Sequence, residues 1–169
     1  MERLWAGWRL PYIEADEHER SAGHAPGLTL FEGIEQSDLD ASVTYILWRG
    51  QRCFALLNAF PYTSGHILVL PKVAAENVED LDDVTYIELF EGVRMAVRAL
   101  KSTYSPDGVN VGMNLGRASG AGIPNHLHVH VLPRWTGDTN FITSVAEARV
   151  LPESLGDTWR RIESAWPTA

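Results

Sequence analysis

Three histidines alternate with aliphatic residues late in the chain. His126, His128 and His130 are separated by Leu127 and Val129. In a β-strand, alternate side chains lie on the same face, roughly 7 Å apart, so the three imidazoles are expected to share one face while the aliphatic side chains enter a core. Neutral imidazoles can bind zinc. Alternatively, one of them can attack phosphorus and form a covalent phosphohistidine intermediate, while its neighbours fix its tautomer and protonate the leaving group.

The loop before these histidines favours the second chemistry. Its sequence, LGRASGAGIP at 115–124, contains Gly116, Gly120 and Gly122. Glycine lets backbone N–H groups approach a phosphate closely, and Ser119 adds a hydroxyl. A plain flexible connection is the alternative interpretation. We expect phosphate contact because the loop leads directly into the histidine strand.

The elements that must position these residues follow from the pattern of apolar residues. Predicted strands lie at 43–49, 52–58, 66–72, 108–114 and 126–133, and the third, which is continuously apolar, is expected to be central. Predicted helices lie at 82–103 and 151–166. This order is typical of an α+β domain with a mostly antiparallel, about five-stranded sheet, one long helix and a C-terminal helix. We expect a single domain at 43–169, on which residues 1–42 pack as an N-terminal extension.

The overall composition argues against several classes of function. The 169 residues carry a formal net charge of −8, whereas a general nucleic-acid binder normally shows a basic face. The single cysteine, Cys53, cannot form an intramolecular disulfide. No apolar run approaches the roughly 20 residues of a membrane span, and residues 1–14 contain charges rather than a signal-type apolar stretch. We therefore expect a cytoplasmic protein with neither nucleic acid nor a membrane as partner.

Taken together, these motifs resemble the histidine triad (HIT) family. The segment NHLHVHVLPRW at 125–135 is similar to the family signature, in which three histidines alternate with apolar residues. FALLNAFPYTSGHILVLPK at 54–72 resembles the family's nucleoside-binding strand pair, and GVNVGMNLG at 108–116 resembles the strand that adds a second polar contact. The resemblance covers about residues 43–135 and implies a HIT-like fold.

The resemblance also implies a substrate class and a role for each histidine. The substrate is a nucleotide with a cleavable bond at the α-phosphate, and His128 is the nucleophile that forms a nucleotidyl-histidine intermediate. Water, phosphate or another acceptor then resolves this intermediate. His126 and His130 orient and polarise the groups around it, and His66 completes the polar set that faces the phosphate.

Residues that would hold the nucleoside are implied in the same way. Asn58 would bind the ribose, and Asn114 would contact the ribose or the phosphates. Phe54, Leu56 and Ile34 would lie near the base. The family further implies a homodimer in which the two sheets join into one larger sheet.

Some segments resemble a particular bacterial branch of the family, related to diadenosine tetraphosphate phosphorylases. They are LWAGWR at 4–9, GAGIPNH at 120–126 and RWTGDTNFI at 134–142. In this branch phosphate, rather than water, can accept the nucleotidyl group. Hydrolases and phosphoramidases share the triad, so an adenosine 5′-monophosphoramidase-type enzyme and a non-catalytic nucleotide sensor are the alternatives.

One departure from the family concerns a structural zinc. Many bacterial members bind it through a Cys-x-x-Cys pair, a histidine after the third strand and the first triad histidine. In this chain TLFE at 29–32 lies where the cysteines would be, and Ala74 lies where the zinc histidine would be. We therefore expect no structural zinc, with apolar packing by Leu28, Leu30 and Phe31 in its place. We also expect no tightly bound cofactor, although Mg²⁺ could accompany a polyphosphate substrate.

Overall fold

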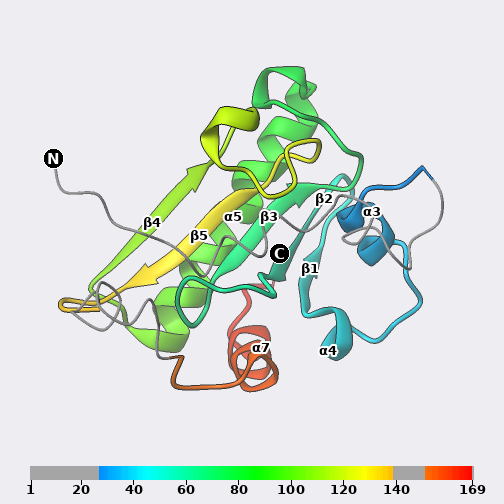
Figure 1. Cartoon of the computed structure of the whole chain (residues 1–169). Coiled ribbons are helices and arrows are strands. Elements are labelled where there is room, and N and C mark those ends of the chain that lie inside the picture. The colour runs from blue at the N-terminus through cyan, green and yellow to red at the C-terminus, as the bar shows by residue number, and fades with distance from the viewer. Residues whose placement is uncertain (1–26, 139–150, 169) are drawn as a thin grey trace, which may run out of the picture.

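A computed structural model describes residues 27–138 and 151–168 of the chain as an α+β fold, as predicted (Figure 1). In chain order its elements are α3 (Leu30–Glu35), α4 (Ala41–Thr44), β1 (Ile46–Arg49), β2 (Cys53–Leu57), β3 (Ile67–Pro71), the 3₁₀ helix η2 (Val78–Asp80), α5 (Asp83–Tyr104), β4 (Gly108–Met113), the 3₁₀ helix η3 (Arg117–Ser119), β5 (Val129–Arg134) and α7 (Leu155–Ser164). Of the segments that resemble the bacterial branch, 4–9 and the end of 134–142 lie outside the described residues.

The five strands form one antiparallel sheet in the order β1-β2-β3-β5-β4. The prediction that 66–72 contains a central strand is confirmed, because β3 lies between β2 and β5 and all five of its residues are buried. β4 lies at the edge of the sheet and pairs along its whole length with β5. The histidine strand therefore has β3 on one side and β4 on the other.

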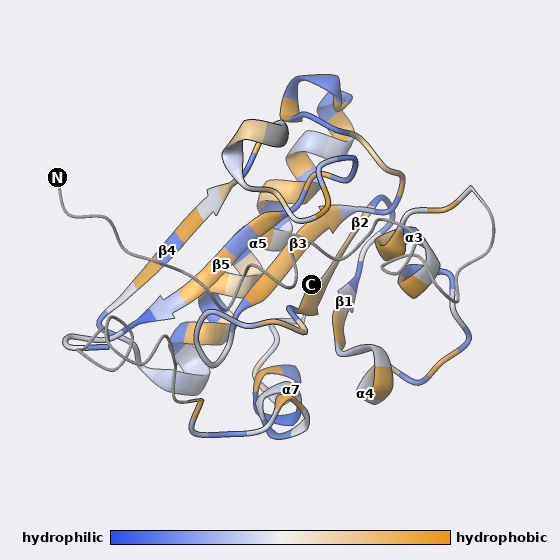
Figure 2. Cartoon of the chain, in the orientation of Figure 1, coloured by the Kyte–Doolittle hydropathy of each residue, from blue (hydrophilic) through white to orange (hydrophobic). Residues whose placement is uncertain are grey.

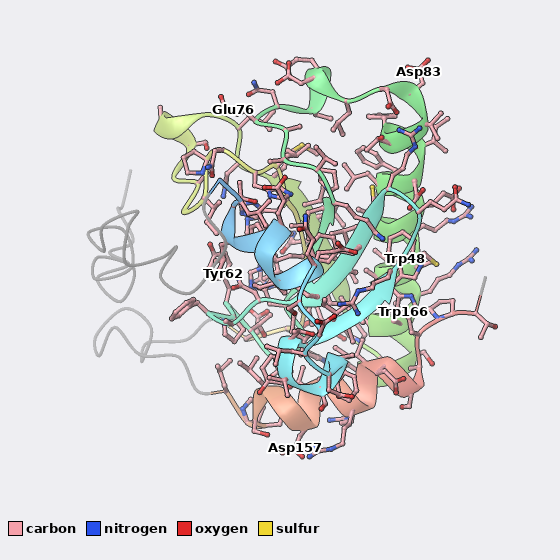
Figure 3. All side chains as sticks on the ribbon, turned by 90° about the vertical axis from the view of Figure 1, so that its right-hand side faces the viewer. Trp48, Tyr62, Glu76, Asp83, Asp157 and Trp166 are labelled. Atoms are coloured by element: carbon pink, nitrogen blue, oxygen red, sulfur yellow. The ribbon has the colours of Figure 1, made fainter. Side chains whose placement is uncertain are left out.

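The two faces of the sheet are covered by different elements. Residues such as Ala55, Val69 and Val131 pack under α5 and α7 in the larger apolar core. On the other face, Phe54 and Leu68 join a smaller cluster closed by residues of α3. Figure 3 shows α5 and α3 on opposite sides of the sheet, and Figure 2 shows how strongly apolar residues dominate β2 and β3.

Helix α5 follows the periodic pattern that predicted it. Asp82 caps its N-terminus by accepting a hydrogen bond from the N–H of Thr85. Its buried residues recur every three or four positions, which places them in one stripe against the sheet. Gly92 lets the helix approach β3 closely, because a Cβ there would lie 2.8 Å from a methyl carbon of Val69.

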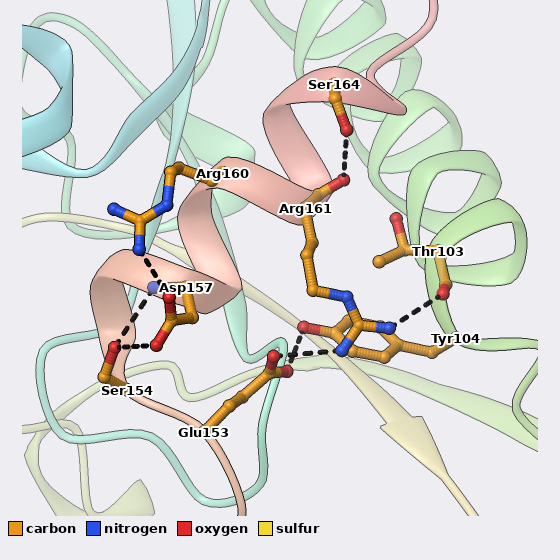
Figure 4. Close-up of polar contacts among 8 residues, drawn as sticks. All are labelled: Thr103, Tyr104, Glu153, Ser154, Asp157, Arg160, Arg161 and Ser164. Carbon is orange, nitrogen blue, oxygen red and sulfur yellow. Dashed lines mark hydrogen bonds and ion pairs between the residues drawn. The ribbon is translucent and has the colours of Figure 1, made fainter.

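Helix α7 is tied to the end of α5 by a polar cluster (Figure 4). The Tyr104 hydroxyl donates to the carboxylate of Glu153, which also forms a 3.0 Å ion pair with Arg161. The Arg161 guanidinium lies over the Tyr104 ring, 4.7 Å from its centroid. Burial is the main cause that raises the pKa of the Tyr104 phenol, and its hydrogen bond to Glu153 raises it further. This cluster joins the two helices on the face of the sheet away from the histidines.

Several predicted boundaries were wrong. The predicted strand 43–49 begins only at Ile46, because residues 41–44 form α4, which is capped by Asp40 and ends at Tyr45 with a left-handed φ of 56°. The predicted helix 151–166 spans 155–164, because Ser154 caps it.

The predicted strand 126–133 is assigned only from Val129. Its start is delayed because the N–H of Leu127 donates to the carbonyl of Ala75 in the loop after β3 rather than to a strand. The division of the chain between residues 42 and 43 stays a prediction. Within the described part of the extension, Phe31 of α3 is buried against the sheet. Among the described residues, no helix combines the length and hydropathy needed to cross a bilayer.

Candidate active site

Four buried histidines gather on the face of the sheet that α5 does not cover. His130 lies opposite Leu68 in the β3–β5 pair, and opposed residues of antiparallel strands project from the same face. His128 shares that face because it lies two residues earlier. The predicted fourth member, His66, is 64 residues from His130 in the chain, yet its Nε2 lies 2.9 Å from Nδ1 of His130. No residue of the four, which include His126, is more than 8% exposed.

The tautomer of His128 is determined by its own backbone. Its Nδ1 lies 2.8 Å from the main-chain carbonyl oxygen of His126. A carbonyl oxygen only accepts, so Nδ1 carries the proton and Nε2 holds a lone pair. Burial lowers the pKa of the His128 imidazole, which keeps the ring neutral near pH 7. The Nε2 lone pair is therefore available to accept a proton or to attack an electrophile.

His66 and His130 form a hydrogen-bonded pair with one fixed direction. The main-chain N–H of Tyr62 donates to Nδ1 of His66 over 3.1 Å, so the proton of that ring lies on Nε2. His66 Nε2–H consequently donates to Nδ1 of His130, whose own proton must then lie on Nε2. Burial, and then the neighbouring His130 and His128, hold the pKa of His66 well below its usual value. The pair thus presents an N–H donor at His130 Nε2.

The ring of His126 is held between two oxygen atoms. Its Nε2 lies 2.8 Å from the carbonyl oxygen of Pro71, and its Nδ1 lies 2.7 Å from the hydroxyl oxygen of Thr29. Burial lowers the pKa of this imidazole, although the Pro71 hydrogen bond and the charge of Glu32 oppose the shift. The edge of the Phe31 ring packs against it, with 5.3 Å between the ring centroids. His126 is therefore a fixed, neutral ring.

The positions expected to correspond to the zinc ligands of the family that the sequence resembles lie together but hold a different structure. The Glu32 carboxylate accepts the N–H of Thr29 over 2.8 Å and the N–H of Ala74 over 3.0 Å. Thr29 in turn contacts His126. This corner offers one histidine and no cysteine, and its one carboxylate is occupied by main-chain donors, so the donor set does not fit a structural zinc, whose four ligands are cysteines and histidines. Across residues 27–138 and 151–168, no three histidine, cysteine or acidic side chains are grouped so that they could hold a metal ion.

The expected apolar packing in place of zinc was only partly right. Phe31 is buried against the histidines, but Leu28 and Leu30 are only half-buried. Hydrogen bonds of Thr29 and Glu32 tie this corner together instead. The reason is the capping box of α3, in which the Thr29 and Glu32 side chains each accept a main-chain N–H of the other residue.

The two predicted asparagines both lie beside the His66–His130 pair. Asn58 accepts the N–H of Phe60 through its Oδ1, and its amide nitrogen lies 3.2 Å from Nδ1 of His66. The Asn114 amide nitrogen lies 3.5 Å from Nε2 of His130, and because both atoms carry protons in the tautomers assigned above, this is a contact rather than a hydrogen bond. Asn58 therefore supports the orientation of His66 while retaining a second amide N–H for another acceptor.

The predicted glycine-rich loop connects β4 to the histidine segment and makes a tight turn. Gly116 and Gly120 flank η3 with φ values of 74° and 82°, a left-handed conformation that favours glycine. The Ser119 hydroxyl donates to the carbonyl oxygen of Gly116 over 2.7 Å, and Gly122 is partly buried. Contact of these residues with a phosphate stays a prediction.

Sequence reasoning missed the ring of Tyr62 and the hydroxyl of Thr29 as parts of the site. Tyr62 lies almost parallel to His130, with 5.7 Å between centroids and an interplanar angle of 23°. No spacing rule marks either residue, because each reaches the histidines only through the folding of its loop. The residues expected near the base do lie on the histidine face, since Ile34, Phe54 and Leu56 belong to the cluster that contains Phe31.

Comparisons with known proteins agree with this architecture. The family model described as HIT domain matches residues 41–137. A protein of Mycobacterium tuberculosis (strain H37Rv) named AP-4-A phosphorylase is 37% identical over 168 residues, which cover 98% of this chain and 85% of that protein. A bis(5′-nucleosyl)-tetraphosphatase [asymmetrical] of Schizosaccharomyces pombe is 31% identical over 93 residues, 55% of this chain and 50% of that protein.

A solved structure gives the same result for the fold. A zinc-bound histidine triad family protein from Mycobacterium smegmatis superposes with a TM-score of 0.65 at 26% identity, covering 80% of this chain and 91% of that chain. The predicted family resemblance, and its bacterial branch, are confirmed by these matches.

Proposed function

Because the chain belongs to the HIT domain family, we propose that it cleaves dinucleoside polyphosphates of the diadenosine tetraphosphate type at the α-phosphate and transfers the nucleotidyl group to inorganic phosphate. The similarity to a protein named AP-4-A phosphorylase supports this choice of substrate and acceptor. The observation that carries the chemistry is the 2.8 Å hydrogen bond from His128 Nδ1 to the carbonyl of His126, which leaves the Nε2 lone pair for attack.

The reaction proceeds in two displacements. In the first, Nε2 of His128 forms a bond to the α-phosphorus, and the bond from phosphorus to the bridging oxygen breaks, with the electron pair leaving on that oxygen. With diadenosine tetraphosphate, ATP departs and an adenylyl-histidine remains. In the second, a phosphate oxygen attacks the same phosphorus, ADP departs and His128 is restored.

The chain's remaining polar groups serve the leaving oxygen and the phosphate. The N–H at His130 Nε2, whose direction His66 sets, donates to the oxygen that gains charge as the bond breaks. Main-chain N–H groups of the loop with Gly116, Gly120 and Gly122 face the phosphates, together with the Ser119 hydroxyl. The chain has a formal net charge of −8, so its overall field does not attract a polyanion. Binding of the phosphates therefore depends on these neutral donors within the site.

The nucleoside is held by the residues that adjoin the histidines. The apolar cluster with Ile34, Phe54 and Leu56 takes the base. The second amide N–H of Asn58 binds the ribose, and Asn114 binds the ribose or a phosphate. Mg²⁺ enters with the polyphosphate rather than as a resident ion, and we propose no tightly bound cofactor. The compartment proposed is the cytoplasm.

A homodimer completes the proposal. β4 is an edge strand whose Asn110, Val111 and Gly112 are exposed. An edge strand presents backbone groups that can pair with another chain. A second copy that pairs along β4 would extend the sheet across both subunits. Light scattering on a sizing column should then give twice the chain mass, and the substitution Val111→Pro, which disrupts edge pairing, should reduce it to the monomer mass.

Comparing the products with and without phosphate tests the proposed activity. Diadenosine tetraphosphate should yield ADP and ATP only when phosphate is present. Equal turnover without phosphate, with AMP as product, would instead indicate a hydrolase. Cleavage of adenosine 5′-phosphoramidate but of no dinucleoside polyphosphate would indicate a phosphoramidase, and no turnover of either would leave the nucleotide sensor.

Trapping the intermediate tests the nucleophile. Rapid quenching of the protein with diadenosine tetraphosphate in the absence of phosphate, followed by mass spectrometry, should show one added adenylyl group on the peptide that contains His128. His128→Ala should show none, while His126→Ala should still bind nucleotide. An adduct of unchanged yield in His128→Ala would exclude the proposed nucleophile.

A further inference from the structure

The Thr29 hydroxyl links the start of α3 to a histidine that is 97 residues away in the chain. Thr29 is the N-cap of α3, and the capping box with Glu32 holds its side chain in place. In that position its oxygen lies 2.7 Å from Nδ1 of His126. The contact therefore depends on local helix capping for its geometry and on tertiary packing for its partner.

The proton in this contact has a defined position. The carbonyl of Pro71 can only accept, so the proton of His126 lies on Nε2, and Nδ1 of the neutral ring needs a donor. The same hydroxyl lies 2.9 Å from Oε2 of Glu32, to which it can also donate, so the carboxylate and the imidazole compete for its one proton. That carboxylate already accepts two main-chain N–H groups, from Thr29 and Ala74. Because the carboxylate keeps both main-chain donors when the hydroxyl turns away, whereas Nδ1 of the neutral His126 ring needs this donor, we assign the proton to the imidazole.

The same histidine contacts the nucleophile through its backbone. The carbonyl oxygen of His126 accepts the Nδ1–H of His128 over 2.8 Å. Phe31, two residues after Thr29, also packs on both rings, with centroid separations of 5.3 Å to His126 and 5.5 Å to His128. A shift of His126 would therefore move the group that determines which nitrogen of His128 carries the proton.

We propose that Thr29 and Glu32 are positioning residues, which lock the ring of His126 so that its main-chain carbonyl keeps His128 in the Nδ1–H tautomer. Neither residue is placed against the reacting atoms. The effect on the tautomers is independent of the activity, whereas the effect on turnover rests on the proposed function. Without the hydroxyl, the buried Nδ1 of His126 lacks a donor, the ring reorients, and His128 samples the Nε2–H form, which has no lone pair at Nε2.

Nitrogen NMR of histidine-labelled protein tests the tautomers directly. Long-range ¹H–¹⁵N spectra distinguish protonated from unprotonated ring nitrogens, and single histidine substitutions assign the signals. We expect the unmodified protein to show Nε2–H at His126 and Nδ1–H at His128. Thr29→Val should give mixed forms at both rings, whereas Thr29→Ser, which retains the hydroxyl, should match the unmodified protein.

Two further variants separate this effect from a loss of helix capping. Thr29→Gly removes the hydroxyl, but glycine is tolerated at N-cap positions nearly as well as threonine, so it should give the same mixed tautomers even if Thr29→Val folds poorly. Thr44→Val removes a hydroxyl from α4 that donates to the carbonyl of Asp40. It should leave both histidines unchanged.

Turnover of diadenosine tetraphosphate provides the second readout. Thr29→Val and Thr29→Gly should lower kcat by roughly tenfold to a hundredfold with little change in KM, because a small misplacement of the nucleophile is costly, and Thr29→Ser should restore it. Unchanged tautomers and kcat in both hydroxyl-free variants would overturn the inference. If the unmodified protein turns over no dinucleoside polyphosphate but the tautomers shift as expected, the proposed function fails and the positioning role stands.

Discussion

The two ends of the histidine row are held by different kinds of partner. At the His130 end the partner is a second imidazole, His66, whose direction is determined by the main-chain N–H of Tyr62. At the His126 end the partners are the hydroxyl of Thr29 and the carbonyl of Pro71. One end therefore has a chain of rings, and the other has a single ring held between oxygen atoms.

The difference teaches how a row of like residues acquires unlike roles. A main-chain N–H can only donate and a carbonyl can only accept, so each determines which nitrogen of the imidazole it contacts carries the proton. A ring that is hydrogen-bonded to that imidazole then has its own proton position determined in turn. At the His130 end this gives an N–H at Nε2. In the middle of the row it gives a lone pair at Nε2 of His128. Neighbouring imidazoles thus offer an N–H donor and a lone pair without any difference in residue type.

The largest expected effect comes from breaking the His130 end. His66→Asn removes the donor to Nδ1 of His130, so the N–H at His130 Nε2 loses its direction, and kcat should fall roughly a hundredfold, as is typical for loss of general acid–base assistance. The loss should be much smaller for a p-nitrophenyl ester of AMP, whose leaving group needs no donor. Equal losses for both substrates would contradict a role at the leaving oxygen.

A backbone substitution beside His66 should weaken the same end more indirectly. Gly65 has a φ of 79°, and an added Cβ would lie 3.0 Å from side-chain atoms of Leu100 and Tyr104. Gly65→Ala should lower the free energy of unfolding by about 1–3 kcal/mol, measured with urea. Gly108→Ala is the matched control, since its added Cβ would meet nothing within 4 Å. Similar losses in both variants would mean that the conformation at Gly65 carries no strain.

Acid should destabilise both ends of the row together. The pKa values of His66, His126 and His128 lie below 6.5 in the folded protein, mainly because of burial. As the pH falls below 6.5, the unfolded chain binds protons that the folded chain does not. The stability that comes from these neutral rings is therefore complete above pH 6.5. As the pH decreases below 6.5, the free energy of unfolding should decrease by up to about 1.4 kcal/mol per pH unit for each histidine.

Urea titrations at pH 7.5, 6.5 and 5.5 measure this slope. The carboxylates with lowered pKa values titrate at a lower pH and contribute little in this window. His66→Asn should reduce the slope by the share of one histidine. Stability that is constant or increases toward pH 5.5 would show that the three rings are not held neutral by the fold.

The smallest expected effect concerns the face of the sheet that α5 and α7 cover. Because this face lies away from the histidines, we expect it to contribute to stability and not to turnover. Tyr104→Phe removes the hydroxyl that donates to Glu153 and should cost about 1 kcal/mol of unfolding free energy. It should leave kcat unchanged, because α5 and α7 lie on the other side of the sheet from the histidines. Tyr86→Phe, at a half-exposed ring on α5, should change neither quantity. A large loss of kcat in Tyr104→Phe would show that the two faces are coupled.

The sequence by itself determined the features that depend on local periodicity. Alternation placed His128 and His130 on one face and Val129 and Val131 in the core, as observed, because side chains of a strand alternate regardless of what surrounds it. The long helix and the central strand followed in the same way from their apolar spacing. The family motifs added His66 and the substrate class, which spacing alone does not supply.

Only the tertiary structure decided which atom of each ring carries the proton. That choice depends on Tyr62, Pro71 and Thr29, which approach the histidines from three separate segments of the chain. It also decided that polar groups occupy the corner where apolar packing was expected, because the capping box of α3 turns Thr29 toward His126. These hydrogen bonds require a donor and an acceptor from separate segments to be placed to within a few tenths of an ångström. No local sequence pattern encodes that distance.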